Sequence, residues 1–252
     1  MAKAIGIDCA TPLTLDTARM LAAAGNRFAA RYLVPSSYAW KRLTRSEAEV
    51  ITKAGMHIVS VFETSANRPA GGASSGRADG AAAYREAQAI GQPPGSAIYY
   101  AVDYDAPPQD YDAIEAYLLA AASQIPGYAT GVYGSFAVVE EMAKRHACSH
   151  FWQTYAWSGG KRSTHANLYQ HRNNVQIAGI TVDLNESFGN EGWWSLQLEQ
   201  PEEENLLMSK EDAIAIIGFL QAAWKAATTQ ADKDEFHRLA NEVRKVANIP
   251  LE

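Results

Sequence analysis

Long apolar runs are missing from this 252-residue chain. No stretch of about 18 such residues occurs, so we expect no membrane span. Cysteine is scarce, and Cys9 and Cys148 are too few for a disulfide framework or a structural zinc site. Basic residues are fewer than acidic ones, since the chain has 22 Lys and Arg and 28 Asp and Glu. A net charge of −6 argues against a nucleic-acid partner, which requires a basic face.

Several functional motifs are also lacking. The chain has no G-x-S-x-G nucleophile elbow and no phosphate-binding loop. The N-terminal residues pass almost directly into an apolar strand, without the apolar core and small-residue cleavage site of a signal peptide. We therefore expect synthesis in the cytoplasm without a signal peptide.

What the sequence does have is a regular alternation of short apolar runs and helical patterns. Candidate strands cover residues 3–8, 28–33, 57–62, 97–105, 129–133, 150–155, 166–170 and 180–184. Helical patterns cover residues 13–24, 44–54, 81–90, 111–123 and 136–146, and a Gly, Ala and Ser-rich loop is expected at 64–80. Eight such strands predict an α/β fold, a (β/α)8 TIM-type barrel that is somewhat irregular in its helix-poor last third. A doubly wound open sheet is the alternative, but the first turn, residues 8–12, has no glycine fingerprint for a dinucleotide.

The composition changes after residue 195. We expect a barrel over residues 1–195, an acidic linker over 196–206 and a two-helix hairpin over 207–252. Ser209 with Asp212 is a helix-capping pattern, followed by apolar residues at helical spacing. A hairpin of this size is too small to be reliably stable alone, so it should dock on the barrel or self-associate. Targeting, oligomerisation and a packing lid all remain open.

Acidic residues mark the predicted strand ends. Asp103 and Asp105 follow one apolar run, and alternation along a strand points both the same way. Two like charges this close allow one carboxyl to stay protonated beside an ionised one. An Asp-rich turn is the alternative, since two prolines follow. In a barrel these two acids would meet Asp8, Glu63 and Asp183 at one rim, where active sites lie.

The same strand ends supply aromatic, amide and guanidinium side chains suited to a sugar. These are Arg31, Tyr133, Trp152, Gln153, Tyr155, Trp157, Tyr169 and Gln170. Glycoside hydrolysis needs two carboxyl groups, one as acid and one as nucleophile or base. Metal binding is the rival use of clustered acids, but no contiguous ligand loop is present, and His146 and His150 lack the Glu of a metalloprotease motif. We therefore predict neither a metal nor a cofactor.

A family resemblance rests on motifs in order along residues 3–190. They are G-I-D-C-A at 6–10, R-Y-L at 31–33, K-R-L-T-R-S-E at 41–47, A-G-M-H-I-V-S-V-F-E at 54–63, I-Y-Y-A-V-D-Y-D at 98–105, G-V-Y-G-S at 131–135, F-W-Q-T-Y-A-W at 151–157 and V-D-L-N at 182–185. The chain resembles the glycoside-hydrolase-like domain family catalogued as domain of unknown function 1906. That family is similar to the family 25 glycoside hydrolases, lysozymes that cut peptidoglycan.

The resemblance implies roles for the acids and a peptidoglycan-like partner. Asp8 and Asp183 match the first-strand and last-strand acids, and Asp103 and Asp105 fall on an Asp-x-Glu pair whose Glu donates the proton. Asp105 is one methylene shorter than that Glu, and Glu63 is our hypothesis for the missing longer acid.

Three functions follow from these observations. The first is a peptidoglycan-directed glycosidase acting at the bacterial cell wall after release or lysis. The second is a non-catalytic glycan-binding barrel, and the third is a structural phage or spore-coat component. The helical tail resembles tails of phage or prophage cell-wall proteins.

Overall fold

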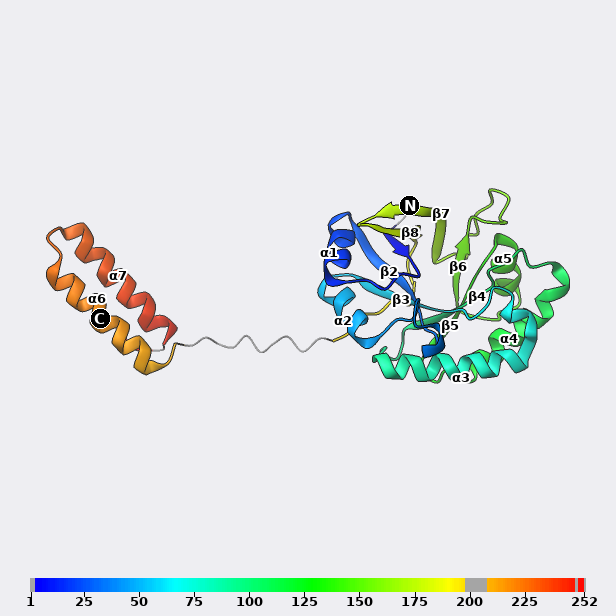
Figure 1. Cartoon of the computed structure of the whole chain (residues 1–252), viewed down its shortest axis with the longest axis horizontal. Coiled ribbons are helices and arrows are strands. Elements are labelled where there is room, and N and C mark those ends of the chain that lie inside the picture. Colours follow the sequence, from blue (N-terminus) through cyan, green and yellow to red (C-terminus); the bar gives the residue numbers. More distant parts are fainter. Residues whose placement is uncertain (1–2, 198–207, 248, 252) are drawn as a thin grey trace. The chain divides into compact units, whose positions relative to one another are not determined.

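The computed structural model describes residues 3–197, 208–247 and 249–251. Contacts between Cα atoms divide the chain into two compact units, Met1–Leu198 and Glu199–Glu252, which we describe separately. The first unit is a barrel and the second is a pair of helices (Figure 1).

A closed eight-stranded barrel forms the first unit, with its strands in chain order (Figure 1). This confirms the predicted barrel. The strands are β1 (Ala4–Asp8), β2 (Asn26–Tyr32), β3 (His57–Phe62), β4 (Ala97–Ala101), β5 (Ala129–Gly134), β6 (His150–Thr154), β7 (Leu168–Ile177) and β8 (Ile180–Ser187). Strand β8 departs from the all-parallel arrangement of a regular TIM-type barrel, because it runs antiparallel to both β7 and β1. A short turn joins β7 to β8. Two parallel neighbours would need a long crossover connection, so the short turn makes this pair antiparallel.

Three of the five helices of the barrel, α1, α2 and α5, begin at a side-chain cap. They are α1 (Leu15–Ala23), α2 (Arg45–Lys53), α3 (Gly72–Ile90), α4 (Tyr111–Ala122) and α5 (Phe136–Lys144), with short 3-10 turns η1 (Ser36–Tyr38), η2 (Arg68–Gly71) and η3 (Pro108–Asp110). Thr44 and Ser135 accept hydrogen bonds from the backbone N–H groups of Glu47 and Val138, as their positions predict. No helix lies between β6 and β8, which agrees with the predicted irregular last third.

Helix α3 corrects the loop expected over residues 64–80, because residues 72–80 are helical. Small residues are common in loops, but here they let α3 approach α4 closely. A Cβ atom added at Gly76 would overlap the carbonyl oxygen of Tyr117, and one added at Gly80 would lie 2.7 Å from the carbonyl oxygen of Ala121. The Gly and Ala content therefore reflects helix packing.

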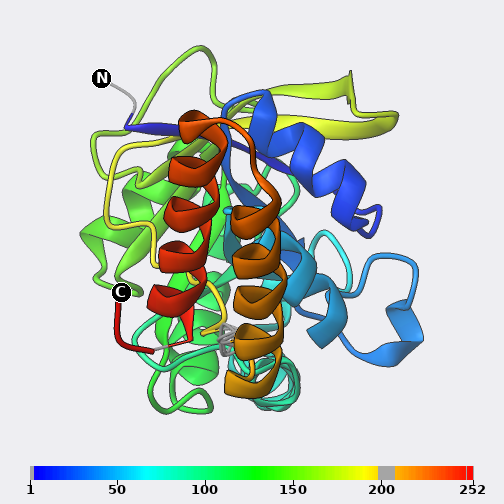
Figure 2. The same ribbon diagram turned by 90° about the vertical axis from the view of Figure 1, so that its left-hand side faces the viewer.

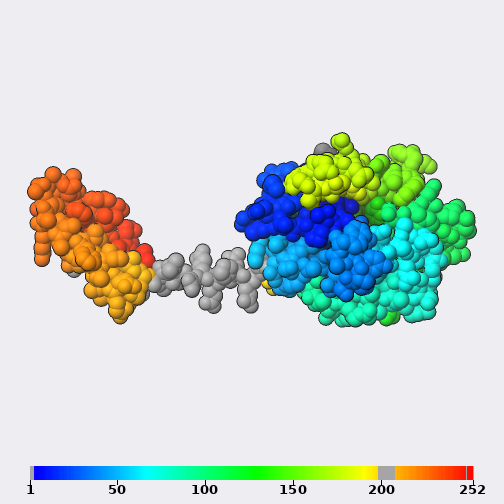
Figure 3. Space-filling view, in the orientation of Figure 1, coloured from blue at the N-terminus to red at the C-terminus, as the bar shows by residue number. Residues whose placement is uncertain are grey.

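Alternation along the strands divides the barrel core into two layers. Phe28, Ala30, Val61 and Tyr99 belong to a cluster that fills the barrel interior. The intervening residues belong to a larger cluster between the sheet and the helices. On β2 the even-numbered residues therefore face inward, and the odd-numbered Arg31 faces the helices. In the space-filling view, residues from the first half of the chain form most of the barrel surface that is seen (Figure 3).

The segment after β8 returns across the amino-terminal end of the barrel. The Tyr99 hydroxyl donates to the carbonyl of Glu191 (2.8 Å), and the backbones of Ile58 and Trp194 bond reciprocally (2.7 and 2.9 Å). Leu196 is buried, and its N–H donates to Thr52 Oγ1 (3.1 Å). Residue 196, where the linker is predicted to begin, thus packs on the barrel, and residues 198–206 of that prediction lie outside the described residues.

The second unit consists of α6 (Lys210–Ala226) and α7 (Gln230–Val246), which run side by side (Figure 2). Ser209 caps α6 through the N–H of Asp212, as predicted. Phe219 is 77% exposed and Ile214 62% exposed. Self-association of this hairpin stays a prediction. None of the helices in the described ranges has the length and apolarity that crossing a membrane requires.

Candidate functional site

A cavity of about 130 Å³ opens at the carboxyl ends of the barrel strands. It gathers four of the five predicted acids, Asp8, Glu63, Asp103 and Asp183. The other residues that line it are Tyr32, Val61, Ala101, Tyr133, Trp152, Gln170 and Asn173. Side chains far apart in the sequence thus meet in one polar hollow, at the end of the barrel where catalytic residues of this architecture converge.

Asp8, the last residue of β1, is the most buried of the four acids and is 7% exposed. Its Oδ2 accepts hydrogen bonds from Gln170 Nε2 (2.9 Å) and Asn185 Nδ2 (2.7 Å). Burial and the neighbouring charge of Asp183 outweigh these bonds and raise the pKa of Asp8 to about 7. Asp8 is therefore poised to hold or release a proton near neutral pH.

Asp183 lies opposite Asp8 in the register of β8 with β1. Because β8 is antiparallel, Asp183 reaches this rim from the first half of its strand rather than from the end. Its Oδ1 accepts from the N–H of Asn174 (2.8 Å), and its Oδ2 accepts from Gln170 Nε2 (3.3 Å). Burial raises the pKa of Asp183 above its ordinary value.

Asp103 and Glu63 form a second pair of acids, at the ends of β4 and β3. Burial and the charge of Glu63 raise the pKa of Asp103, while Lys41 opposes this rise. Lys41 Nζ lies 3.3 Å from Glu63 Oε2, and both side chains are largely buried. Lys41 thus forms an ion pair with one acid of this pair, Glu63.

Amide and aromatic side chains fix the geometry between the two pairs. Gln170 Oε1 accepts from the Tyr133 hydroxyl (2.9 Å) while its Nε2 donates to Asp8, so its amide orientation is determined. Trp152 Nε1 donates to Asn185 Oδ1 (2.8 Å). Trp152 also packs edge-on against Tyr133, with ring centroids 4.8 Å apart. Tyr133, Trp152 and Gln170 thus lie where the sequence predicts, in the cavity wall.

Asp105 does not line the cavity. Strand β4 ends at Ala101, so the alternation expected to carry Asp103 and Asp105 to the same side stops before either residue. Asp105 is exposed in the turn that leads to η3, as in the alternative of an Asp-rich turn.

Arg31 and Gln153 also lie outside the cavity, because both point away from the barrel interior. Arg31 is fully buried and pairs with Glu47 (Nε to Oε1, 2.7 Å), and its other nitrogens donate to the carbonyls of Cys9 and Lys41. Gln153 is fully buried too, and its amide bonds to the backbone of Lys161 and Ser163. Both residues hold loops in place.

The remaining predicted sugar contacts lie beyond the cavity lining. Tyr169 alternates with the inward-facing Gln170, and the Arg162 guanidinium lies 5.8 Å from its ring centroid. Tyr155 and Trp157 are 42% and 46% exposed in the loop after β6. Their place at a strand end makes them candidates for contacts with a longer ligand.

Four polar residues at or beside the cavity are not among the predicted site residues: Tyr32, Lys41, Asn173 and Asn185. Tyr32 and Asn185 could have been found from alternation, since Asn185 shares a strand face with Asp183. Asn173 follows a register shift in β7, and such bulges redirect side chains. Its Oδ1 is buried without a hydrogen-bond partner. No local sequence signal marks Lys41 or Asn173.

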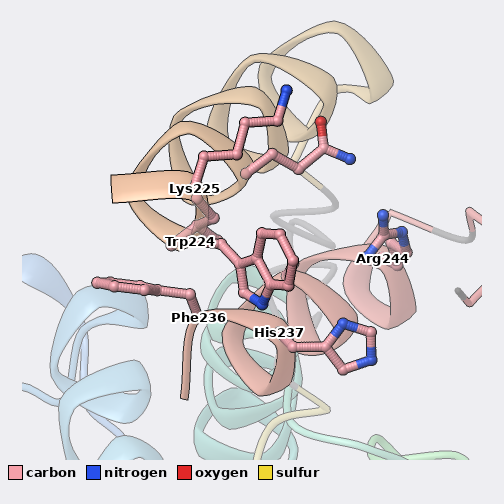
Figure 4. Close-up of a pocket in the computed structure, with 8 residues that line it drawn as sticks. Trp224, Lys225, Phe236, His237 and Arg244 are labelled. Carbon is pink, nitrogen blue, oxygen red and sulfur yellow. The ribbon is translucent and has the colours of Figure 1, made fainter. Parts of the chain in front are cut away.

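A second, larger cavity lies in the helical hairpin. Trp224 and Lys225 of α6 and Phe236, His237 and Arg244 of α7 are among the residues that line it (Figure 4). It contains no carboxyl group, so the acid chemistry belongs to the barrel cavity. Among the described residues no three His, Cys, Asp or Glu side chains are arranged to hold a metal ion.

The acid-lined barrel places the chain in a class of proteins related to glycoside hydrolases. A model of the Rv2525c-like, glycoside hydrolase-like domain family matches residues 19–187. The chain belongs to this family. The uncharacterized protein FadG of Bacillus subtilis is 35% identical over 112 residues, which cover 41% of this chain. The match spans only 19% of FadG, about a fifth of its length.

Solved structures show the same fold. The Tat-secreted protein Rv2525c of Mycobacterium tuberculosis, in complex with L-tartrate, is 26% identical with a TM-score of 0.70, and the match covers 76% of this chain and 99% of that one. The Streptococcus pneumoniae virulence factor GHIP, a glycosyl hydrolase 25, is 13% identical with a TM-score of 0.52, over 74% of this chain and 87% of that one. At this identity the likeness shows the fold alone.

The expectation about localisation is wrong in the light of these comparisons. We expected a protein without a signal peptide that reaches the cell wall after release or lysis. Rv2525c, which is similar over most of its length, is a Tat-secreted protein. The composition of the N-terminal residues is therefore an insufficient basis for that expectation.

Proposed function

We propose that the barrel is a glycoside hydrolase acting on bacterial peptidoglycan or a related glycan. The observation that carries the proposal is the gathering of four carboxyl groups in one cavity, where burial raises the pKa of Asp8 and Asp103 and Lys41 pairs with Glu63. Glycosidases require one protonated and one ionised carboxyl group beside the bond that breaks. The peptidoglycan assignment rests on the resemblance to family 25 lysozymes.

In this proposal Asp103 is the general acid. Its pKa is raised, and it is less buried than Asp8, so a substrate reaches it more easily. It protonates the leaving glycosidic oxygen, while Glu63, held by Lys41, acts at the anomeric carbon as nucleophile or base. Asp8 and Asp183 position the sugar and adjust the charge of the cavity.

Release of reducing sugar from purified peptidoglycan tests this function. The wild-type protein should release it, and Asp103→Asn and Glu63→Gln should each lower the rate by about 100-fold or more, the usual contribution of an acid or base. Asp105→Asn is the matched control and should keep most of the activity, because Asp105 lies outside the cavity. Equal losses in all three variants would contradict these roles.

A glycan-binding barrel without turnover is the second candidate. The small size of the cavity, about 130 Å³, favours it, because pockets for small-molecule ligands usually exceed about 300 Å³. The cavity therefore suits one sugar ring rather than two rings flanking a bond. Retained binding to cell walls without release of reducing sugar would support this candidate over the first.

A further inference from the structure

Lys41 is a buried cation next to two residues that line the acidic cavity, Glu63 and Tyr32. The residue is 6% exposed, although lysine is almost never buried without a partner. Its Nζ lies 4.3 Å from the ring centroid of Tyr32, 5.4 Å from that of Trp40 and 5.9 Å from that of Tyr38. Three aromatic faces thus surround the ammonium group and offset part of its loss of water.

The backbone at Lys41 is held as firmly as the side chain. Arg31 Nη2 donates to the carbonyl of Lys41 (3.2 Å), and Arg31 is itself fixed by its buried ion pair with Glu47. The Lys41 N–H donates to the carbonyl of Tyr38 (3.0 Å). These bonds fix the main chain from which the ammonium group reaches Glu63, whose Oε2 is 3.3 Å away.

Lys41 contacts two residues that line the cavity, Glu63 and Tyr32. Lys41 is not among the residues that line the cavity, whereas Tyr32, which its ammonium covers, is. Among the cavity-lining residues there is no Lys, Arg or His at all. Four acids thus share the cavity, and Lys41 is the cation that pairs with one of them, Glu63.

We infer that Lys41 is a positioning residue, which holds the Glu63 carboxylate in place and supplies positive charge close to Asp103. The inference rests on the proposed function for its catalytic meaning, but not for its test. The charged and titratable groups that face Asp103 are Glu63, Lys41, Asp183, Tyr133, Asp8 and Tyr32. Of these, Lys41 supplies positive charge, so its removal should favour protonation of Asp103.

The test is a titration of Asp103 by carbon-13 NMR of the full-length protein with labelled Asp carboxyl groups, assigned with Asp103→Asn. Lys41→Met keeps the apolar stem and removes the charge, and it should raise the midpoint for Asp103 by about one pH unit. Glu63→Gln should lower the midpoint, and Lys41→Arg should keep it near the wild-type value. Arg42→Met is the control, since Arg42 pairs with Glu86 at 2.6 Å outside the cavity.

A double variant keeps the inference testable if Lys41→Met does not fold. Lys41→Met with Glu63→Gln removes both charges of the pair, and its midpoint should lie above that of Glu63→Gln alone. An Asp103 midpoint that does not respond to loss of Lys41 in either background would overturn the inference.

Activity provides a separate readout. If the protein releases reducing sugar, the same variants should shift the pH profile of the rate in the same directions. If no glycan is hydrolysed, the proposed function fails while the titration still decides the role of Lys41.

Discussion

Replacing Asp8 with asparagine is expected to stabilise the protein at neutral and alkaline pH. Asp8 is buried beside Asp183, and its pKa rises from 3.8 to about 7. Below pH 3.8 the carboxyl is protonated in both the folded and the unfolded chain. Between 3.8 and about 7 the folded protein retains a proton that the unfolded chain has lost, so a rise in pH favours unfolding. Above about 7 this loss of stability is complete.

The magnitude follows from the pKa difference. About three pH units correspond to about 4 kcal/mol of unfolding free energy at 25 °C. Asparagine keeps an oxygen that accepts from Gln170 and Asn185, and its amide can donate toward Asp183. We therefore expect Asp8→Asn to be about 2 to 4 kcal/mol more stable than wild type at pH 8, and nearly equal to it at pH 4.

Urea unfolding of the full chain at pH 4, 6 and 8, followed by tryptophan fluorescence, measures this difference. Asp105→Asn is the control, because Asp105 is exposed, and it should change the free energy of unfolding by less than about 0.5 kcal/mol at each pH. The reasoning is refuted if Asp8→Asn has the same effect at pH 4 and pH 8, or if it destabilises the protein at pH 8.

Three further predictions concern packing and binding. Arg31→Met should destabilise the barrel by about 3 to 5 kcal/mol in urea unfolding, because Glu47 is left as a buried, unpaired charge. Adding Glu47→Gln should recover part of that loss. Gly76→Ala should lower the melting temperature, measured by calorimetry, because its methyl group meets the backbone of Tyr117. Asn173→Ala should weaken binding of peptidoglycan fragments in calorimetric titrations with little loss of stability, because its buried Oδ1 has no partner to lose.

The barrel could be predicted because its signals are local. Each strand is a short apolar run, and Thr44 and Ser135 stand directly before helical patterns, where a Ser or Thr is typical of a helix start. The direction of β8 left no such signal. An apolar run does not indicate whether its strand is parallel or antiparallel to the neighbouring strands. The short connection from β7 is the only sequence feature that indicates the antiparallel direction of β8.

The candidate site could be predicted only in part. A residue near the end of a strand can point into the barrel or toward the surrounding helices, and its place at the strand end does not decide between the two. Arg31 ends on the outer face of β2 and Tyr32 on the inner face, although the two are neighbours. Asp105 was assigned by extending β4 four residues past Ala101. Lys41 comes from a connection between elements, and its approach to Glu63 depends on tertiary contacts that no spacing rule reveals.

The return of residues 191–196 across the base of the barrel determines how the protein can be dissected. Trp194 donates through Nε1 to Ser60 Oγ (3.0 Å), and His57 stacks on Trp193 with ring centroids 4.7 Å apart. An expression fragment that stopped at Ser187, where the last strand ends, would expose the amino-terminal end of the barrel. It would also leave the hydroxyls of Ser60 and Tyr99 with fewer hydrogen-bond partners. The shortest autonomous fragment therefore extends to at least Leu196, beyond the end of the family match at residue 187.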